Sequence, residues 1–316
     1  MTIVADSFVV PERRGTAGRV SDFFWRHPHV LLAVLLGPPL IWLGIVYLGS
    51  LFALLLQSFF SIDEFSGLIN YEFTLATYRQ LLTEANLDII LRTVVMAALV
   101  TLASAVIAFP IAYYAARYAR GKWKALFYLA VMLPLWSSYL VKVYAWKLVL
   151  AKEGILTWFF AKLNLLWLLD AWLSLPIVGG NSLSISYTGT FIVFVYVWMP
   201  FMILPIQAAL ERVPATLIEA SADLGGTPAQ TFRHVIFPLA LPGIVAGSIF
   251  TFSLTLGDYI IPQIIGSSRL FIGQAVYAQQ GTAGNIPLAA AFTVVPIVIM
   301  GAYLWMAKRM GAFDAL

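Results

Sequence analysis

The sequence has no cysteine, few charged residues and only three histidines. Without cysteine there can be no disulfide, no thiolate metal site and no cysteine nucleophile. His27, His29 and His234 form no helical ligand pair with a third donor nearby, so no metal site is predicted. The phosphate-binding pattern G-x-x-x-x-G-K-[ST] is also missing. We therefore expect the chain to bind no cofactor and to depend on partner subunits for any use of ATP and Mg²⁺.

Apolar residues, by contrast, make up 61% of the chain and charged residues only 11%, and the mean hydropathy is +0.88. One soluble core could not hide so much apolar surface, so we predict an all-α protein that crosses a membrane several times. The net charge of +4 does not indicate nucleic-acid binding, because the basic residues cluster at the ends of apolar blocks.

Six apolar segments are long enough to cross a hydrocarbon core of ~30 Å. Their predicted ranges are 30–57, 88–116, 125–150, 187–210, 239–263 and 286–306. Lys and Arg cluster in the tail 1–29, just after the second segment, in the polar segment 211–238 and directly after the last segment. Because cytoplasmic loops are enriched in these residues, we expect the tail, 211–238 and the C-terminus (309–316) to lie in the cytoplasm.

The segment 155–176 is apolar and rich in tryptophan, so a seventh span is an alternative. A seventh span would place the basic C-terminus outside and bury Lys162, Asn164 and Asp170 in hydrocarbon, at a cost of about a few kcal/mol each. We therefore interpret 151–186 as a loop with interfacial helices at the outer face, where tryptophan is common.

The polar segment 211–238 has the local signals of two short helices joined by a turn. Pro214 is suited to the first position of one helix, and Gly225 can end that helix in a left-handed conformation. Thr227 followed by proline is a good N-cap and first-position pair for a second helix, which would end at Pro238. An ordinary cytoplasmic helical hairpin is one interpretation of this pattern.

The same residues resemble the EAA signature of binding-protein-dependent ABC importer permeases, which reads Glu-Ala-Ala, three residues, Gly, nine residues, Ile-x-Leu-Pro. The match includes Glu219, Ala220, Gly225 and Pro238, while Ser221, Val235 and Phe237 stand where the signature has Ala, Ile and Leu. In that family the segment docks into a cleft on a cytoplasmic ATPase. The resemblance therefore implies a coupling role for Glu219, Ala220, Ser221, Asp223, Gly225 and Pro238.

The fifth apolar segment contains Ser248, Thr251, Thr255 and Asp258, which would form one polar stripe on a continuous helix. Such a stripe belongs inside a helix bundle or along a water-lined path, and not against lipid. A Gly-x-x-x-Gly pair in the same segment would let another helix approach closely. Helix packing alone would also explain this pair.

The third apolar segment carries Pro134, Lys142 and several aromatic residues. Pro134 frees a backbone carbonyl that must find another partner, which predicts a local bend. At ~1.5 Å per residue, Lys142 and Asp258 reach a similar depth, so they either pair with each other or face a solute path. Our candidates for the translocation path are Asp258, Thr255, Thr251, Ser248, Lys142, Trp136 and Tyr139.

The run VMLPLWSSYLVKVYAW in this segment and the following EGIL resemble permeases of the spermidine/putrescine (polyamine) branch of ABC importers, over about residues 88–310. The resemblance implies a type I ABC importer transmembrane domain of six helices over residues 30–308, in a bacterial inner membrane. It also implies a homologous second permease, two cytoplasmic ATPase subunits and an extracytoplasmic substrate-binding protein as partners. Branch members also carry amino-acid-like compounds and ferric ions, and Lys142 would repel a polyamine.

We therefore predict a permease subunit of a bacterial ABC importer, with a polyamine or a related small cation as the expected substrate and no covalent chemistry of its own. A secondary transporter would contain two internal repeats with broken helices in matching positions, and the sequence shows no such repeat. A membrane-embedded enzyme would need an acid or a histidine beside Asp258 at the same depth, and no predicted span supplies one.

Overall fold

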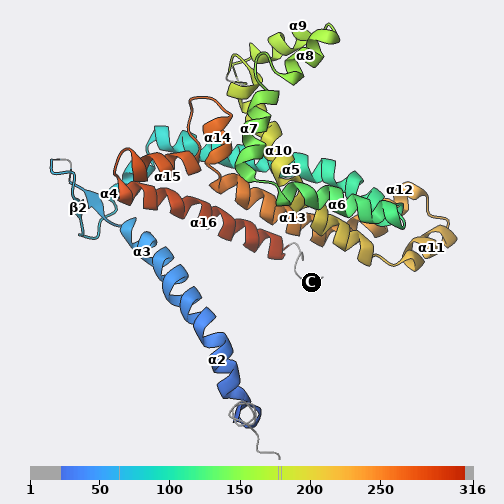
Figure 1. Cartoon of the computed structure of the whole chain (residues 1–316), viewed down its shortest axis with the longest axis horizontal. Helices are drawn as coiled ribbons and strands as arrows, with labels where there is room; N and C mark the ends of the chain where they lie inside the picture. The colour runs from blue at the N-terminus through green and yellow to red at the C-terminus, as the bar shows by residue number, and fades with distance from the viewer. Residues whose placement is uncertain (1–22, 64, 177, 179, 310–316) are drawn as a thin grey trace, which may run out of the picture. The chain divides into compact units, whose positions relative to one another are not determined.

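The computed structural model describes residues 23–63, 65–176, 178 and 180–309, most of them in helices (Figure 1). Most of the predicted cytoplasmic tails, at 1–22 and 310–316, lie outside the described residues. The chain divides into two compact units, Met1–Leu56 and Gln57–Leu316.

The first unit is dominated by one uninterrupted apolar helix. It consists of α2 (Pro28–Ile41), the π-helical η1 (Trp42–Leu48) and α3 (Gly49–Gln57). Pro38 and Pro39 lie just before the wider π turns, which is expected because prolines remove the N–H donors of the α-helical ladder. Within this unit, none of the residues of α2, η1 and α3 is buried, as expected of a single apolar helix that crosses a membrane.

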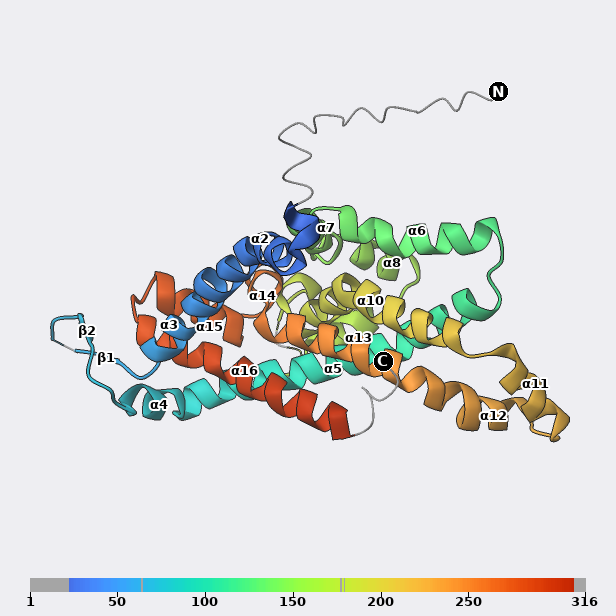
Figure 2. The same ribbon diagram turned by 90° about the horizontal axis from the view of Figure 1, so that it is seen from below.

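Four long helices form the centre of the second unit: α5 (Glu84–Arg117), α10 (Tyr187–Arg212), α13 (Phe237–Gly257) and α16 (Ile286–Arg309). α10 packs against α5 and α13, and α5 and α16 each run along α13 (Figure 2). Small side chains let these backbones approach closely, because Ala108, Ala112 and Ala240 are fully buried against Ile206 and Leu210.

The third predicted span is a broken helix. α6 (Lys122–Trp136) and α7 (Tyr139–Val149) meet at an angle of 95°. The predicted bend is present, but the break comes at Ser137 and Ser138 instead of at Pro134 itself. The Ser137 hydroxyl donates to the Pro134 carbonyl at 2.8 Å, so the side chain replaces the backbone donor that would have continued the helix.

The segment 155–176 does not form a seventh span. It contains α8 (Ile155–Lys162) and α9 (Leu166–Leu173), with Asn164 in the left-handed conformation between them. Each helix has 8 residues and is therefore ~12 Å long, which is too short to cross a bilayer.

Short elements connect the long helices. They are β1 (Ser61–Ile62), β2 (Ile69–Asn70), α4 (Ala76–Leu81), the 3₁₀ turn η2 (Leu183–Ile185), α14 (Ile260–Ile264) and α15 (Ile272–Gly281). β1 and β2 form an antiparallel hairpin in which Ser61 pairs with Asn70. In the hairpin loop, the backbone N–H groups of Phe65 and Ser66 donate to the Asp63 carboxylate and lower its pKa.

Within the described residues, five helices are long and apolar enough to cross a membrane, and the bent pair α6 and α7 makes a sixth. The prediction of an all-α membrane protein is confirmed, and the described residues supply six spans when the bent pair is counted as one. The predicted range of the fifth span is wrong, because this helix runs over Pro228–Gly257 instead of 239–263. Its early start makes the second helix of the polar segment continuous with the membrane span.

Candidate coupling segment and translocation path

The polar segment begins with α11 (Ala215–Asp223). Pro214 has an extended backbone and occupies the N-cap position, so the helix begins one residue later than predicted. The left-handed conformation predicted after the helix is present at Gly225, whose φ is +77°. The next amide, of Gly226, donates to the Ser221 carbonyl at 2.9 Å and so satisfies a carbonyl at the end of α11.

α12 (Pro228–Thr231) begins with the predicted cap. Thr227 accepts a hydrogen bond from the Gln230 amide, and the Gln230 side chain accepts one from the Thr227 amide, which completes a capping box. The helix does not end at Pro238 as predicted. The π-helical η3 (Phe232–Ile236) widens the turns before Pro238, so the missing N–H of this proline is accommodated without a break.

The structure brings α11 and α12 together through Ser221, one of the three residues that depart from the signature. Its hydroxyl lies 2.8 Å from that of Thr231, which is buried. Glu219, Ala220 and Asp223 are exposed on α11, and a groove of ≈ 480 Å³ runs beside the turn. Its lining includes Leu217, Ser221, Leu224, Gly225, Gln230 and His234. Pro238 is exposed on the following helix, beyond this groove.

A polar cluster at the base of the segment was not anticipated from the sequence. The Glu211 carboxylate accepts hydrogen bonds from Lys124 at 2.9 Å, Tyr128 at 2.9 Å and Gln207 at 3.3 Å. In addition, the Arg117 side chain donates to the Val213 carbonyl at 2.9 Å. The end of α10 is thus joined to α5 and α6 directly before α11 begins.

The predicted polar stripe is present only in part. Ser248, Thr251 and Thr255 are buried inside the second unit and do not face lipid. Each donates to a backbone carbonyl of the preceding turn, and Ser248 also contacts the Tyr303 hydroxyl at 2.6 Å. Asp258 does not continue the stripe, because α13 ends at Gly257 and Asp258 is extended.

Of the two alternatives for Lys142 and Asp258, the ion pair is not formed in the described structure. Lys142 Nζ donates to the Pro134 carbonyl at 2.7 Å, where the cation stabilises the negative end of α6. Asp258 instead accepts a hydrogen bond from the Tyr139 hydroxyl. Trp136, the last residue of α6, is 74% exposed.

Tyr139 and Asp258 connect two helix breaks. Tyr139 is the first residue of α7 after the 95° bend, and Asp258 lies between α13 and α14. α7 packs against α14, and the ring of Trp198 stacks on Tyr139 with 5.8 Å between ring centroids. The sequence analysis did not identify Trp198, because a single tryptophan in an apolar helix does not indicate which residues it contacts.

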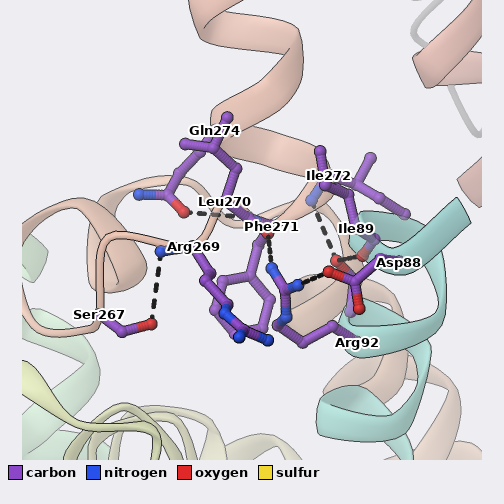
Figure 3. A network of polar contacts seen from close by, with 10 residues as sticks. Asp88, Ile89, Arg92, Ser267, Arg269, Leu270, Phe271, Ile272 and Gln274 are labelled. Carbon is purple, nitrogen blue, oxygen red and sulfur yellow. Dashed lines mark hydrogen bonds and ion pairs between the residues drawn. The ribbon is translucent and has the colours of Figure 1, made fainter. Parts of the chain in front are cut away.

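A second network joins α5 to the segment before α15 (Figure 3). Arg92, which the sequence placed inside a span, donates to the Leu270 carbonyl at 2.8 Å and pairs with Asp88. The neighbouring Thr93 hydroxyl accepts from the Ile272 amide at 3.0 Å. The charge of Arg92 is thereby balanced within the described residues. This network lies at the end of the unit opposite to α11 and α12 (Figure 1).

Comparison with known proteins gives relatives that are named as transport permeases. The chain is 60% identical over 306 residues to the inner membrane ABC transporter permease protein YdcU of Escherichia coli (strain K12), with 97% of each chain covered. It is 30% identical over 257 residues to the spermidine/putrescine transport system permease protein PotB of the same strain, with 80% of this chain and 89% of PotB covered.

A solved bacterial ABC transporter involved in the import of the acidic polysaccharide alginate has the same fold. The TM-score is 0.65 at 15% identity, with 92% of this chain and 99% of that chain covered. Residues 108–312 match the family described as "binding-protein-dependent transport system inner membrane component". The chain therefore belongs to this family and is an inner-membrane permease subunit of an ABC importer.

Proposed function

We propose that this chain forms one half of the translocation path of a bacterial ABC importer for a polyamine or a related small cation. A homologous permease supplies the other half, and an extracytoplasmic binding protein delivers the solute. Two cytoplasmic ATPase subunits bind the ATP and Mg²⁺, so the chain itself needs no cofactor. Both of its termini lie in the cytoplasm, as its distribution of Lys and Arg supports.

The observation that carries the coupling role is the continuity of the helix behind the coupling turn. From Pro228 to Gly257 the chain forms 30 helical residues, a length of about 45 Å. One end follows the Gly225 turn, and the other ends directly before Asp258. A displacement of α11 by a docked ATPase subunit is therefore transmitted along one rigid element to the helix break at Asp258, which Tyr139 contacts from the other break.

The substrate class is supported by the likeness to PotB and by the position of Lys142. The contact of Lys142 with the Pro134 carbonyl places this cation at a helix end, so its charge is not directed at a solute. Amino-acid-like compounds and ferric ions remain alternative cargoes. A secondary transporter without an ATPase is the alternative from another class.

The test is purification of the tagged permease followed by transport in proteoliposomes. We expect ATPase subunits and a second permease to copurify, and we expect labelled spermidine or putrescine to accumulate only with ATP and the binding protein. Copurification without polyamine uptake would leave the coupling role and exclude the substrate class. Uptake that needs an ion gradient and no ATPase subunit would favour the secondary transporter.

A further inference from the structure

Both oxygens of the Asp258 carboxylate accept hydrogen bonds from neutral groups, and only one of them is bonded by a side chain. Oδ1 accepts hydrogen bonds from the backbone amides of Ile260 at 2.7 Å and Ile261 at 3.3 Å. Oδ2 accepts a hydrogen bond from the Tyr139 hydroxyl. In the part of the chain that the structure describes, neither of the ion pairs formed by Asp and Glu with basic residues involves Asp258. An acid at membrane depth without a cationic partner marks a functional position.

Aromatic residues lie next to both partners of the hydrogen bond between Tyr139 and Asp258. Trp198 stacks on Tyr139 with an angle of 17° between the ring planes, and Tyr259 follows Asp258 in the chain. Tyr259 stacks on Tyr277 at 5.1 Å between centroids, and these two side chains are 39% and 58% exposed. A carboxylate beside aromatic faces is the combination of groups that binds organic ammonium ions.

We propose that Asp258 binds an ammonium group of the transported polyamine, which displaces the Tyr139 hydroxyl from Oδ2. This inference rests on the proposed function and assigns a binding contact to it. An ammonium makes charge-assisted hydrogen bonds that are stronger than the bond from a neutral phenol, so the exchange is favourable. Once Tyr139 has moved, the face of Trp198 that it covered becomes available for a cation–π contact.

The position of this contact links binding to helix movement. Tyr139 begins α7 and Asp258 precedes α14, so the hydrogen bond between them joins two short helices across two breaks. Replacing Tyr139 by a substrate ammonium removes that connection and frees α7 to move relative to α14. Backbone amides continue to hold Oδ1, so Asp258 keeps its place during the exchange.

The experiment compares two variants that remove the two partners of this hydrogen bond. Asp258→Asn keeps an oxygen for the backbone amides and loses the charge, whereas Tyr139→Phe keeps the ring and loses the competing hydroxyl. Spermidine uptake is measured in proteoliposomes with the complete complex, the binding protein and ATP, and assembly is checked by copurification. Asp170→Asn, at an exposed acid on α9, is the matched control.

We expect Asp258→Asn to assemble and to raise the KM for spermidine at least about tenfold, as the loss of a hydrogen bond to a charged group predicts. Tyr139→Phe should lower this KM, and Asp170→Asn should not change it. Equal loss of uptake in Asp258→Asn and Tyr139→Phe would show that the bond is only structural and would overturn the inference. So would an unchanged KM in Asp258→Asn. A wild-type complex that imports no polyamine would instead overturn the proposed substrate class.

Discussion

Gly225 in the turn after α11 is distinguished by its backbone conformation alone. Its φ of +77° lies in the left-handed region, and a Cβ added there would meet no atom within 4 Å. Any effect of a substitution therefore comes from backbone strain, which for L-residues in this region is about 1–2 kcal/mol. Asparagine tolerates this region better than a β-branched residue does.

We expect Gly225→Val to insert and assemble but to lose most uptake, because the end of α11 changes direction. Gly225→Asn should lose clearly less uptake than Gly225→Val. Uptake and substrate-stimulated ATP hydrolysis in proteoliposomes measure both variants. Gly301→Val is the control, because Gly301 also has open space around it but lies inside α16. Wild-type uptake and ATP hydrolysis in Gly225→Val would show that this turn does not couple the ATPase to transport.

The base of the polar segment 211–238, our candidate coupling segment, is held by contacts between helices. Glu211 at the end of α10 pairs with Lys124 on α6, and both side chains are partly exposed, at 28% and 38%. A pair in this setting contributes about 0.2–1 kcal/mol, so its value lies more in positioning than in stability. Because α6 runs from this pair to the break before Tyr139, it offers a second connection between the coupling segment and Asp258.

A double-mutant cycle with Lys124→Met and Glu211→Gln tests this connection. We expect each single variant to reduce the solute imported per ATP hydrolysed, and the double variant to be no worse than Glu211→Gln, because contacting residues are not additive. The exposed neighbour Lys122, as Lys122→Met, serves as the control. Strictly additive losses would mean that the two residues act independently.

The contact between α10 and α13 depends on the absence of side chains at two glycines. A Cβ at Gly243 would lie 2.5 Å from the Pro205 carbonyl oxygen and 2.5 Å from the Ala209 Cβ, and one at Gly247 would lie 2.8 Å from Met202 Sδ. The helix that approaches the predicted Gly-x-x-x-Gly pair is therefore α10 of the same chain. The backbone must shift to admit even one methyl group.

Gly243→Ala should consequently destabilise the permease by about 1–3 kcal/mol, because overpacking at a backbone contact cannot be relieved by a rotamer change. Thermal inactivation of the purified protein in detergent measures this loss. Gly301→Ala, with open space around its Cβ, should leave the inactivation midpoint unchanged. Equal midpoints for Gly243→Ala and the wild type would contradict the close packing of α10 on α13.

The orientation of the whole permease in the membrane is open to cysteine labelling, because the chain has no cysteine of its own. The structure guides the choice of sites. A side chain at Gly180 would lie 1.8 Å from the Ile185 carbonyl oxygen, and one at Gly226 would lie 2.7 Å from that of Ser221. Asn181 and Leu224 are exposed and lie beside these glycines, so they are better positions.

We expect Asn181→Cys to react with an impermeant thiol reagent added outside intact cells, and Leu224→Cys to react only after the cells are opened. The reason is the excess of Lys and Arg on the side of the coupling segment, which the positive-inside rule assigns to the cytoplasm. Labelling yield on the purified chain is the readout. The opposite pattern would reverse the topology and exclude contact between α11 and a cytoplasmic ATPase.

The sequence alone was sufficient for features that depend on local chemistry. Apolar length indicated how many segments could cross the membrane, Gly225 predicted the left-handed turn, and Thr227 with Pro228 predicted the cap of α12. These features were predictable because they depend on the φ range of one residue or on a hydrogen bond between residues three positions apart, and both can be inferred from a short stretch of sequence. The family signature could be recognised for the same reason, since it lies within one short segment.

Only the tertiary structure decided which distant side chains meet. Asp258 bonds Tyr139 and not Lys142, Lys142 caps α6, and Glu211 joins Lys124. Equal depth in the membrane left pairing with Lys142 and a position on a solute path both open for Asp258, because depth does not say which way a helix faces or where it breaks. α6 and α13 end at their breaks, and the chain changes direction after α6. These changes in the backbone determine which partner each buried polar group meets.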